Sequence, residues 1–242
     1  MLLKNNLKKM INFQQFEVLS FDCYGTLIDW ESGILKALKT ILFNHNIPTD
    51  SEKQILEMFA QSESSLESGE YLSYREILKR VVQYFGEQLD FTPTEAELNY
   101  LAESIQDWKP FFDTVESLKA LKKRYKLTII SNIDDDLFAY SAKKLEVKFD
   151  WVITAQQVKS YKPSLQNFEV AIERMGISPE KLLHLAQSVY HDIVPAKSMG
   201  ITAVWVNRRK GKEGTGATVA ASGNPDLEVP DLKTLVSLMG LD

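Results

Sequence analysis

Five short apolar segments, separated by longer stretches with helical periodicity, constrain the fold of this 242-residue chain more than any other feature. Each has the length of a single β-strand, and together they cover residues 16–21, 127–131, 151–154, 182–186 and 202–206. Strands that alternate with helices along a chain form a mainly parallel sheet, joined by right-handed crossovers and covered by helices on both faces. The sequence therefore predicts an α/β fold with a Rossmann-like, mainly parallel sheet.

About 100 residues separate the first predicted strand from the second, whereas a crossover between parallel strands needs only about a dozen. Apolar residues in this stretch recur at helical spacing, as at Ile77, Val81 and Phe85. Thr94 and Glu97 add the capping-box pattern of a helix start. The sequence therefore predicts a helical subdomain inserted after the first strand.

These patterns divide the chain into a core and an insertion. Ligands bind outside the carboxyl ends of the strands in an open parallel sheet, so an insertion that follows the first strand covers that region, and we call it the cap. Asp113 and Glu116 show a capping-box pattern where the core resumes. The predicted parts are a leader at residues 1–14, the core at residues 15–30 and 110–242, and the cap at residues 31–109.

Charge and cysteine content narrow the class of partner. A formal net charge of −5 argues against a general affinity for nucleic acid or for an anionic membrane. No apolar stretch approaches the roughly 20 residues that a membrane-spanning helix needs. The single cysteine, Cys23, excludes an intrachain disulfide and fits a reducing compartment. We expect a cytoplasmic protein that acts on a small molecule, and the sequence leaves its oligomeric state open.

Polar residues follow four of the predicted strands. The set comprises Asp22 with Thr26 after the first strand, Ser131 with Asn132 at the second, Lys162 after the third and Asp192 after the fourth. The carboxyl ends of parallel strands meet at one edge of a sheet, so these side chains are expected to converge. They supply a carboxylate that attacks, a cation that keeps it ionised, groups for an anionic substrate and a second carboxylate that activates water. The set predicts hydrolysis through an ester.

The same residues resemble the four ordered motifs of the haloacid dehalogenase-like superfamily, a likeness that spans about residues 15–210. The matching segments are residues 21–27 (FDCYGTL), Ser131-Asn132, Lys162-Pro163 and residues 187–192 (QSVYHD). The resemblance implies that the catalytic residues are Asp22 as the nucleophile, Thr26, Lys162 and Asp192. It also implies a substrate-binding set of Tyr24, Ser131, Asn132, His191 and Arg208.

Two positions distinguish the chain from the phosphatases that it resembles. Those enzymes carry an acid two positions after the nucleophile, where this chain has Tyr24, and a further acid where it has Gln187. Because Mg²⁺ favours carboxylate oxygens, we expect no metal cofactor, with Mg²⁺ at Asp22 and Asp192 as the alternative. Both departures are typical of the 2-haloacid dehalogenases, which displace a halide without metal.

Residues 21–31, 190–192 and 208–214 further resemble a relative that hydrolyses azetidine-2-carboxylate.

The resemblance therefore predicts a hydrolase that attacks a carbon of a small 2-substituted carboxylic acid through an aspartyl ester. Two alternatives remain open: a Mg²⁺-dependent phosphatase of small molecules, and a non-catalytic binding protein on the same core. The haloacid enzymes hold their substrate with a cap arginine near a Trp-Arg pair, and this chain has no such pair. One residue of the cluster Arg208, Arg209, Lys210 and Lys212 is the predicted substitute, with Arg208 assigned to substrate binding. If the leaving group is an amine, His191 is the candidate proton donor.

Overall fold

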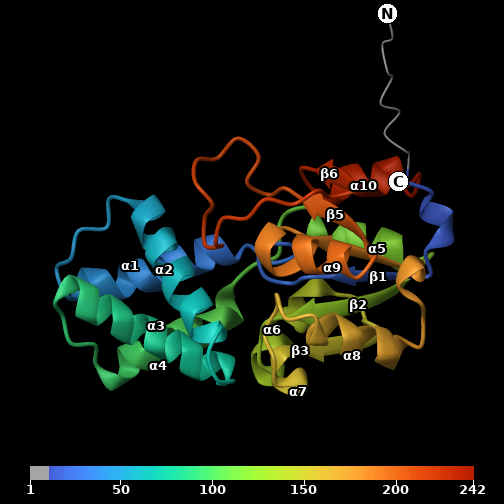
Figure 1. Cartoon of the computed structure of the whole chain (residues 1–242). Helices are drawn as coiled ribbons and strands as arrows, with labels where there is room; N and C mark the ends of the chain where they lie inside the picture. Colours follow the sequence, from blue (N-terminus) through green and yellow to red (C-terminus); the bar gives the residue numbers. More distant parts are fainter. Residues whose placement is uncertain (1–10) are drawn as a thin grey trace, which may run out of the picture.

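A computed structural model describes residues 11–242, which form one six-stranded sheet with helices on both faces and a helical body at one end (Figure 1). The strands are β1 (Val18–Phe21), β2 (Lys126–Ser131), β3 (Trp151–Thr154), β4 (Leu182–Ala186), β5 (Thr202–Val206) and β6 (Leu227–Val229). Their order is β3-β2-β1-β4-β5-β6, and every neighbouring pair is parallel. The predicted Rossmann-like α/β fold is confirmed.

The helices fall into two groups along the chain. Those of the insertion are α1 (Trp30–Asn44), α2 (Glu52–Glu67), α3 (Tyr74–Leu89), α4 (Glu95–Ser104) and the 3₁₀ turn η2 (Ile105–Asp107). Those of the core are α5 (Thr114–Lys122), α6 (Asp135–Leu145), α7 (Ala155–Val158), α8 (Gln166–Met175), α9 (Val194–Ser198) and α10 (Leu232–Leu238), with the short segments η1 (Phe13–Gln15), η3 (Pro179–Lys181) and η4 (Val189–Ile193).

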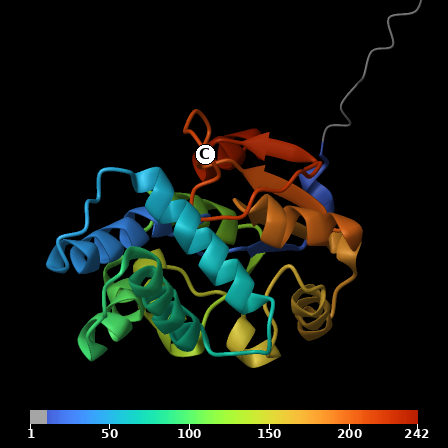
Figure 2. The same cartoon turned by 60° about the vertical axis from the view of Figure 1, so that its left-hand side comes forward.

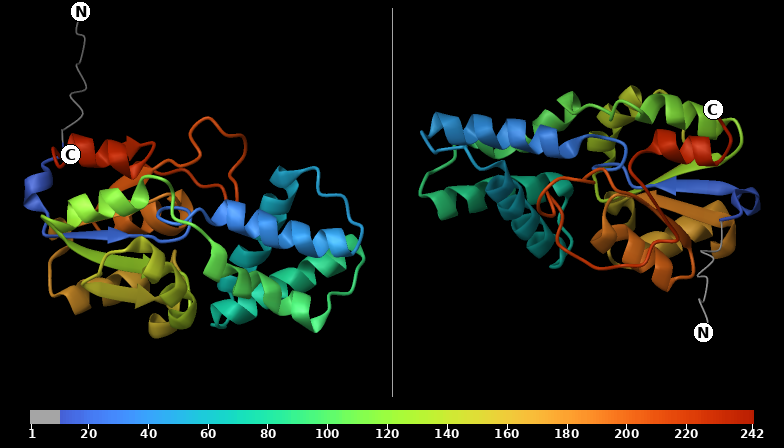
Figure 3. Two further views of the ribbon diagram at one scale, coloured as in Figure 1. Left: turned by 180° about the vertical axis from the view of Figure 1, so that it is seen from behind. Right: turned by 90° about the horizontal axis from the view of Figure 1, so that it is seen from above.

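The sheet is buried on both faces because successive side chains of a strand point in opposite directions. Leu19 and Phe21 of β1 belong to one core cluster together with side chains of α5, α6 and α10. Val18 belongs to a second cluster with side chains of α8 and α9. Figure 3 shows helices above and below the sheet in its right-hand view. Burial of two apolar faces fixes the strands, and so it fixes the positions of the residues that follow them.

The insertion lies at the end of the sheet toward which the strands point (Figures 1 and 3). Its helices begin at Trp30 and end at Asp107, close to the predicted cap at residues 31–109. The capping box of Thr94 and Glu97 is present at the start of α4. Figure 2 shows α2 lying along the boundary between the insertion and the sheet. Within residues 11–242, none of the helices combines the length and apolar character needed to cross a bilayer.

The five predicted strands are all present, and the structure adds details at the two ends of the chain. β6 was not predicted, because three residues around the exposed Glu228 give no apolar run. Most of the predicted leader lies outside the described residues. At its end, Ile11 and Phe13 pack against the core, and the Tyr125 hydroxyl donates a hydrogen bond to the Phe13 carbonyl at 3.0 Å. The core therefore includes a few residues that precede Gln15.

The predicted capping box of Asp113 and Glu116 is wrong. The Asp113 side chain makes no capping hydrogen bond to α5. Its Oδ1 instead accepts a hydrogen bond from Arg208 Nη1 at 2.7 Å, and its Oδ2 accepts one from the backbone N–H of Leu232 at 2.7 Å. Both charged side chains are buried, with exposed fractions of 0% for Asp113 and 5% for Arg208. Asp113 therefore joins α5, the loop after β5 and the start of α10.

We predict that Asp113→Ala lowers the free energy of unfolding by about 3–5 kcal/mol, because it leaves a buried arginine without its partner. Glu116→Ala is the matched control, since its side chain is 81% exposed, and it is expected to cost less than about 1 kcal/mol. Urea unfolding followed by circular dichroism measures both values. Equal losses in the two variants would contradict the assignment.

Candidate active site

A buried ammonium group joins two carboxylates at the carboxyl ends of the central strands. Lys162 Nζ lies 3.0 Å from Asp22 Oδ1 and 2.6 Å from Asp192 Oδ1, and it donates a further hydrogen bond to the Ile130 carbonyl at 2.9 Å. The Lys162 side chain is only 1% exposed. All three donor positions of the ammonium are used, so its place between the two carboxylates is fixed.

The sheet brings the members of this ion group together. Asp22 directly follows β1, and Asp192 lies in η4, a π-helical turn shortly after β4, the neighbour of β1. Lys162 comes from the loop after α7, where the Asn132 side chain holds its backbone: Oδ1 accepts from the Lys162 N–H at 2.8 Å, and Nδ2 donates to the Lys162 carbonyl at 3.0 Å. The predicted convergence of the strand ends is what the structure shows.

Thr26 holds the second oxygen of Asp22. Its hydroxyl donates to Asp22 Oδ2 at 2.8 Å and accepts from the Gln187 N–H at 2.9 Å, so the loop after β1 is bound to the segment after β4. Both Asp22 oxygens therefore have a defined donor. This arrangement orients the carboxylate and leaves its remaining lone pairs for the cavity.

His184 supports Asp192 from inside the sheet. Its Nε2 lies 2.9 Å from Asp192 Oδ1, and its Nδ1 lies 2.8 Å from the Ser20 hydroxyl on the adjacent strand β1. An ionised carboxylate only accepts hydrogen bonds, so Nε2 is the donor to Asp192, and Nδ1 bonds the Ser20 hydroxyl. This histidine is buried, as expected from its place inside a strand, and it orients the acid next to it.

Burial and the central cation shift the pKa values of these groups in different directions. Burial raises the pKa of Asp22, and the Lys162 ammonium opposes that effect. Burial alone would also raise the pKa of Asp192, but Lys162 and His184 together hold it below its ordinary value. Burial would lower the pKa of Lys162, whereas the two carboxylates raise it above the usual range. The lysine therefore stays charged, and Asp192 stays ionised at neutral pH.

Asp22 and Asp192 face a small cavity of about 30 Å³, which is room for roughly two ordered waters. Its lining comes from both the core and the insertion, and comprises Asp22, Tyr24, Trp30, Glu63, Glu67, Tyr74, Ser131, Asn132, Lys162, Gln187, Ser188, His191, Asp192 and Thr218. A larger cleft of about 350 Å³ adjoins it, and Glu67, Lys162 and His191 line both spaces. Glu63 and Glu67 of α2 form part of its lining on the side of the insertion.

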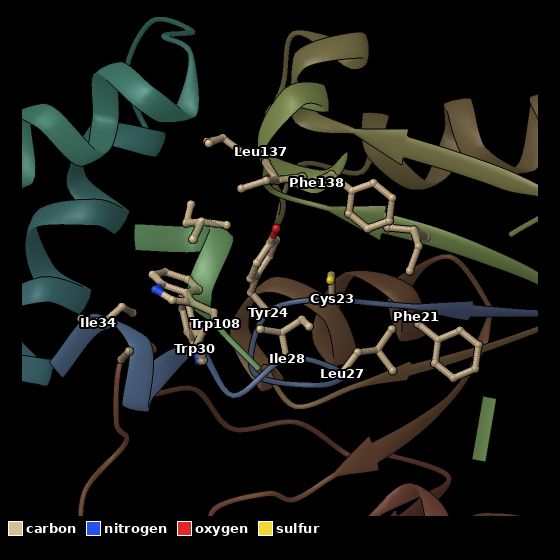
Figure 4. Close-up of a cluster of buried hydrophobic side chains, with 14 of the residues drawn as sticks. Phe21, Cys23, Tyr24, Leu27, Ile28, Trp30, Ile34, Trp108, Leu137 and Phe138 are labelled. Atoms are coloured by element: carbon tan, nitrogen blue, oxygen red, sulfur yellow. The ribbon is translucent and has the colours of Figure 1, made fainter. Parts of the chain in front are cut away.

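Four of the five residues predicted to bind substrate line the cavity, but their polar groups differ in whether they are free to bind a ligand. The Ser131 hydroxyl is buried and has no hydrogen-bond partner among the described residues. The Tyr24 hydroxyl is directed away, toward Ser141 of α6 at 3.0 Å, and its ring packs edge-on against Trp108, as Figure 4 shows. The Asn132 amide is occupied by Lys162 and by Glu67. Among the predicted residues, the Ser131 hydroxyl is therefore free to bind a ligand, and His191 Nε2 likewise has no hydrogen-bond partner among the described residues.

His191 also lines the cavity, with its Nδ1 3.3 Å from the Ser188 hydroxyl. Burial lowers the pKa of His191 to about 4. The imidazole is therefore neutral at pH 7, and the structure does not support its predicted use as a proton donor to an amine.

Arg208 is a correction to the predicted site, because its side chain does not line the cavity. The guanidinium pairs with Asp113, donates to the Thr26 carbonyl at 3.1 Å and lies over the Phe111 ring. Its burial among these partners makes it a link between the loop after β1, the start of α5 and α10. No arginine from the described residues lines the cavity.

Sequence reasoning missed the residues that the insertion and the last long loop place in the cavity: Glu63, Glu67, Tyr74 and Thr218. A signal for the first two existed in α2, where Leu56, Phe59 and Ala60 form a buried stripe that continues through Glu63 and Glu67 at helical spacing. Acidic residues that continue an apolar stripe are buried together with it. Nothing in the sequence indicates that Thr218 reaches the cavity.

The donor set does not fit Mg²⁺. No group of three or more His, Cys, Asp or Glu side chains between residues 11 and 242 is arranged to hold a metal ion. Asp22 and Asp192 share the Lys162 ammonium, Asp192 Oδ1 also bonds His184, and Gln187 supplies an amide where a carboxylate would be needed. Mg²⁺ favours charged oxygen ligands in octahedral geometry. Here the buried Lys162 ammonium occupies the space between the Asp22 and Asp192 carboxylates.

Comparison with known proteins agrees with this geometry. The model of a family described as haloacid dehalogenase-like hydrolase matches residues 16–200. The chain therefore belongs to that family and is a hydrolase.

Several relatives match over most of their length. Haloacetate dehalogenase H-2 of Moraxella sp. (strain B) is 25% identical over 237 residues, which cover 94% of this chain and 100% of the relative. Glyceraldehyde 3-phosphate phosphatase of Methanothermobacter thermautotrophicus is 28% identical over 197 residues, with 77% and 84% covered. A solved L-2-haloacid dehalogenase superposes with a TM-score of 0.77 at 20% identity, with 93% and 99% covered, and this likeness shows the shared fold.

We predict that Lys162→Met lowers the free energy of unfolding by about 3–5 kcal/mol at pH 8, because two buried carboxylates lose their cation. Without that cation, the pKa values of Asp22 and Asp192 rise in the folded protein, so the folded state binds more protons than the unfolded state. The loss should therefore shrink as the pH falls toward 4. Chemical unfolding at several pH values measures it, with exposed Lys123→Met as the control. A loss that does not depend on pH would contradict this account.

Proposed function

We propose that this hydrolase acts at a carbon atom of a small 2-substituted carboxylic acid and passes through an ester on Asp22. The observation that carries the proposal is the state of Asp22: it faces the cavity with both oxygens oriented, by Lys162 and by Thr26. The residue two positions later, Tyr24, has its hydroxyl bonded away to Ser141. The site thus has a fixed carboxylate, and the position two residues after it carries no acid that could protonate a phosphate ester's leaving oxygen.

In the first step, an oxygen of Asp22 forms a bond to C2 of the substrate, and the leaving group departs with the electron pair of the broken bond. The Ser131 hydroxyl, which has no partner among the described residues, donates to the substrate carboxylate. Lys162 keeps Asp22 ionised before attack, and its charge remains to balance Asp192 once Asp22 has become an ester.

In the second step, Asp192 takes a proton from a water molecule, which attacks the carbonyl carbon of the Asp22 ester. Asp192 Oδ2 is buried and has no hydrogen-bond partner among the described residues, whereas Oδ1 is held by Lys162 and His184. The free oxygen is the one available to the water. The bond between the Asp22 carbonyl carbon and the substrate oxygen then breaks, and the leaving alkoxide takes the proton of the new Asp22 carboxyl group, which gives a 2-hydroxy acid and the Asp22 carboxylate. Asp192 returns to its ionised form when it passes its proton to solvent.

The substrate can be specified further only by identifying its leaving group. A halide is the leaving group in the haloacid dehalogenases that this chain is similar to, and ring opening of azetidine-2-carboxylate is the reaction of the relative that residues 21–31 resemble. Both reactions place attack at the carbon next to a carboxylate. Assay of 2-chloropropionate and azetidine-2-carboxylate side by side identifies which class is turned over.

We predict that the first turnover transfers an oxygen of Asp22 to the product. With enzyme in excess and ¹⁸O-water as solvent, the 2-hydroxy acid should emerge unlabelled, and the peptide that contains Asp22 should gain the heavy isotope. Mass spectrometry of product and peptide measures both. Asp192→Asn should slow ester hydrolysis more than attack, so that the Asp22 peptide accumulates the mass of the substrate fragment. Heavy oxygen in the first-turnover product would exclude Asp22 as the nucleophile.

We also predict that turnover of the active compound is unchanged in EDTA, because Lys162 lies between Asp22 and Asp192 and Gln187 supplies an amide in place of a carboxylate. p-Nitrophenyl phosphate, assayed under the same conditions with added Mg²⁺, tests the phosphatase alternative. Loss of activity in EDTA with rescue by Mg²⁺ would contradict the proposed function in favour of that alternative.

A further inference from the structure

The long loop between β5 and β6, residues 207–226, reaches from the core toward the insertion (Figures 1 and 3). Arg209 Nη1 of this loop donates to Glu31 Oε2 in the first turn of α1, and the Ala217 N–H donates to Glu31 Oε1 at 3.1 Å. The side chains of Glu31 and Arg209 are each 14% exposed, so this ion pair is largely shielded from water. The loop is therefore attached to the insertion through both oxygens of one carboxylate.

Gly216 lies between these two attachments and has no room for a side chain. Its φ is +71°, and a Cβ at this position would lie 1.8 Å from Glu31 Oε1 and 2.6 Å from Arg209 Nη1. Glycine is the residue that allows both this backbone conformation and so close an approach. The contact with Glu31 therefore fixes the path of the chain just before Thr218.

Thr218 faces the cavity that Asp22 lines. The residue is 5% exposed, and its hydroxyl has no hydrogen-bond partner among the described residues. The Ser131 hydroxyl, at the end of β2, lines the same cavity and is unpartnered in the same way. A buried hydroxyl without a partner costs about 1–3 kcal/mol, a cost that a ligand accepting its proton removes. Two hydroxyls from distant segments thus face one small space and are free to bind.

The other donors of the cavity that could hold a carboxylate are already engaged. The Lys162 ammonium uses its three donor positions within the protein. The Asn132 amide is bonded to the Lys162 carbonyl and to Glu67, and no arginine of residues 11–242 lines the cavity. A carboxylate has two oxygens, so the hydroxyls of Ser131 and Thr218 can each donate to one of them.

We propose that Thr218 is a substrate-binding residue, whose hydroxyl donates to one oxygen of the substrate carboxylate while Ser131 donates to the other. Glu31, Arg209 and Gly216 act as positioning residues, because they hold the loop in the path that brings Thr218 to the cavity. This inference rests on the proposed function and adds a binding residue to its site. Since the loop is attached to α1, the bound carboxylate joins the end of β2 to a segment held by the insertion.

The first test removes the hydroxyl and keeps the shape of the side chain. Thr218→Val should raise KM for the active 2-substituted acid by about ten-fold or more, in line with the loss of one hydrogen bond to a charged group, and should leave kcat within about three-fold. Thr218→Ser restores the hydroxyl and should bring KM back to within about three-fold of wild type. Thr215→Val, at an exposed position of the same loop, is the matched control and should keep the wild-type KM.

The second test moves the loop without touching Thr218. Gly216→Ala should raise KM as Thr218→Val does, because the new Cβ cannot coexist with the contact to Glu31. Gly214→Ala is the control for backbone strain: Gly214 has a φ of +68°, but a Cβ there meets its nearest neighbour, on Lys53, only at 3.6 Å. Thermal unfolding followed by circular dichroism checks that each variant is folded. An unchanged KM in Gly216→Ala would overturn the positioning role.

A third measurement does not depend on turnover. Butyrate and 2-hydroxybutyrate share the carboxylate and differ in the 2-substituent, and isothermal titration calorimetry on the full chain gives Kd for both. Thr218→Val should weaken the two acids by the same factor. Weakening of 2-hydroxybutyrate alone would place the contact at the 2-substituent and overturn the assignment to the carboxylate.

Two further outcomes count against the binding role of Thr218. A KM in Thr218→Val equal to that of wild type would overturn it, and so would a rise in KM that Thr218→Ser fails to reverse, because packing and not the hydroxyl would then be responsible. Turnover through an Asp22 ester with an unchanged KM in Thr218→Val leaves the proposed reaction standing and removes only this residue. Weaker butyrate binding in Thr218→Val without turnover of any 2-substituted acid supports the binding role and counts against the reaction.

Discussion

The arrangement of this molecule depends on one buried ammonium group. Lys162 Nζ contacts Asp22, Asp192 and the Ile130 carbonyl, and its side chain is 1% exposed. A buried charge is tolerated only when it is paired and its hydrogen bonds are satisfied. The ion group therefore requires that the ends of β1 and β4 and the loop after α7 meet within hydrogen-bond distance. The parallel sheet provides this meeting, because β1 lies between β2 and β4 and is fixed by apolar packing on both faces.

The support for the ion group extends into the sheet. Ser20 and His184 occupy neighbouring strands with their side chains joined at 2.8 Å, and His184 in turn holds Asp192 at 2.9 Å. These residues are fully buried, so their positions are set by the strand register that pairs Ser20 with His184. A polar chain of this kind is stable only if every member has its partner. The free oxygen of Asp192 is the exception, and in the proposed mechanism it is the atom that activates water.

The sequence predicted the core well because strand ends and motif residues are local features. Apolar runs located five strands within a residue or two, and topology alone placed Asp22, Ser131, Lys162 and Asp192 at one edge. Contacts between distant segments were not predictable in this way. The positive charges of residues 208–212 favoured Arg208 as a substrate-binding residue. Its partner Asp113 lies 95 residues away along the chain, so only the folded structure shows that the two form a buried ion pair. Glu63 and Glu67 continue the buried stripe of α2, but only the fold shows that this stripe faces the cavity that Asp22 lines.

The division between core and insertion separates two chemical tasks. In the proposed mechanism, the core supplies the nucleophile, its cation and the carboxylate that activates water, and none of these groups depends on which atom leaves the substrate. The insertion adds three polar side chains to the cavity that Asp22 faces: Glu63 and Glu67, with the Tyr74 hydroxyl donating to the first. Carboxyl groups destabilise an anion and stabilise a cation only when they are ionised, and this effect is large in a cavity from which most water is excluded. The same attacking carboxylate can therefore serve different leaving groups when the helices above it change, because discrimination comes from the charge that the insertion presents.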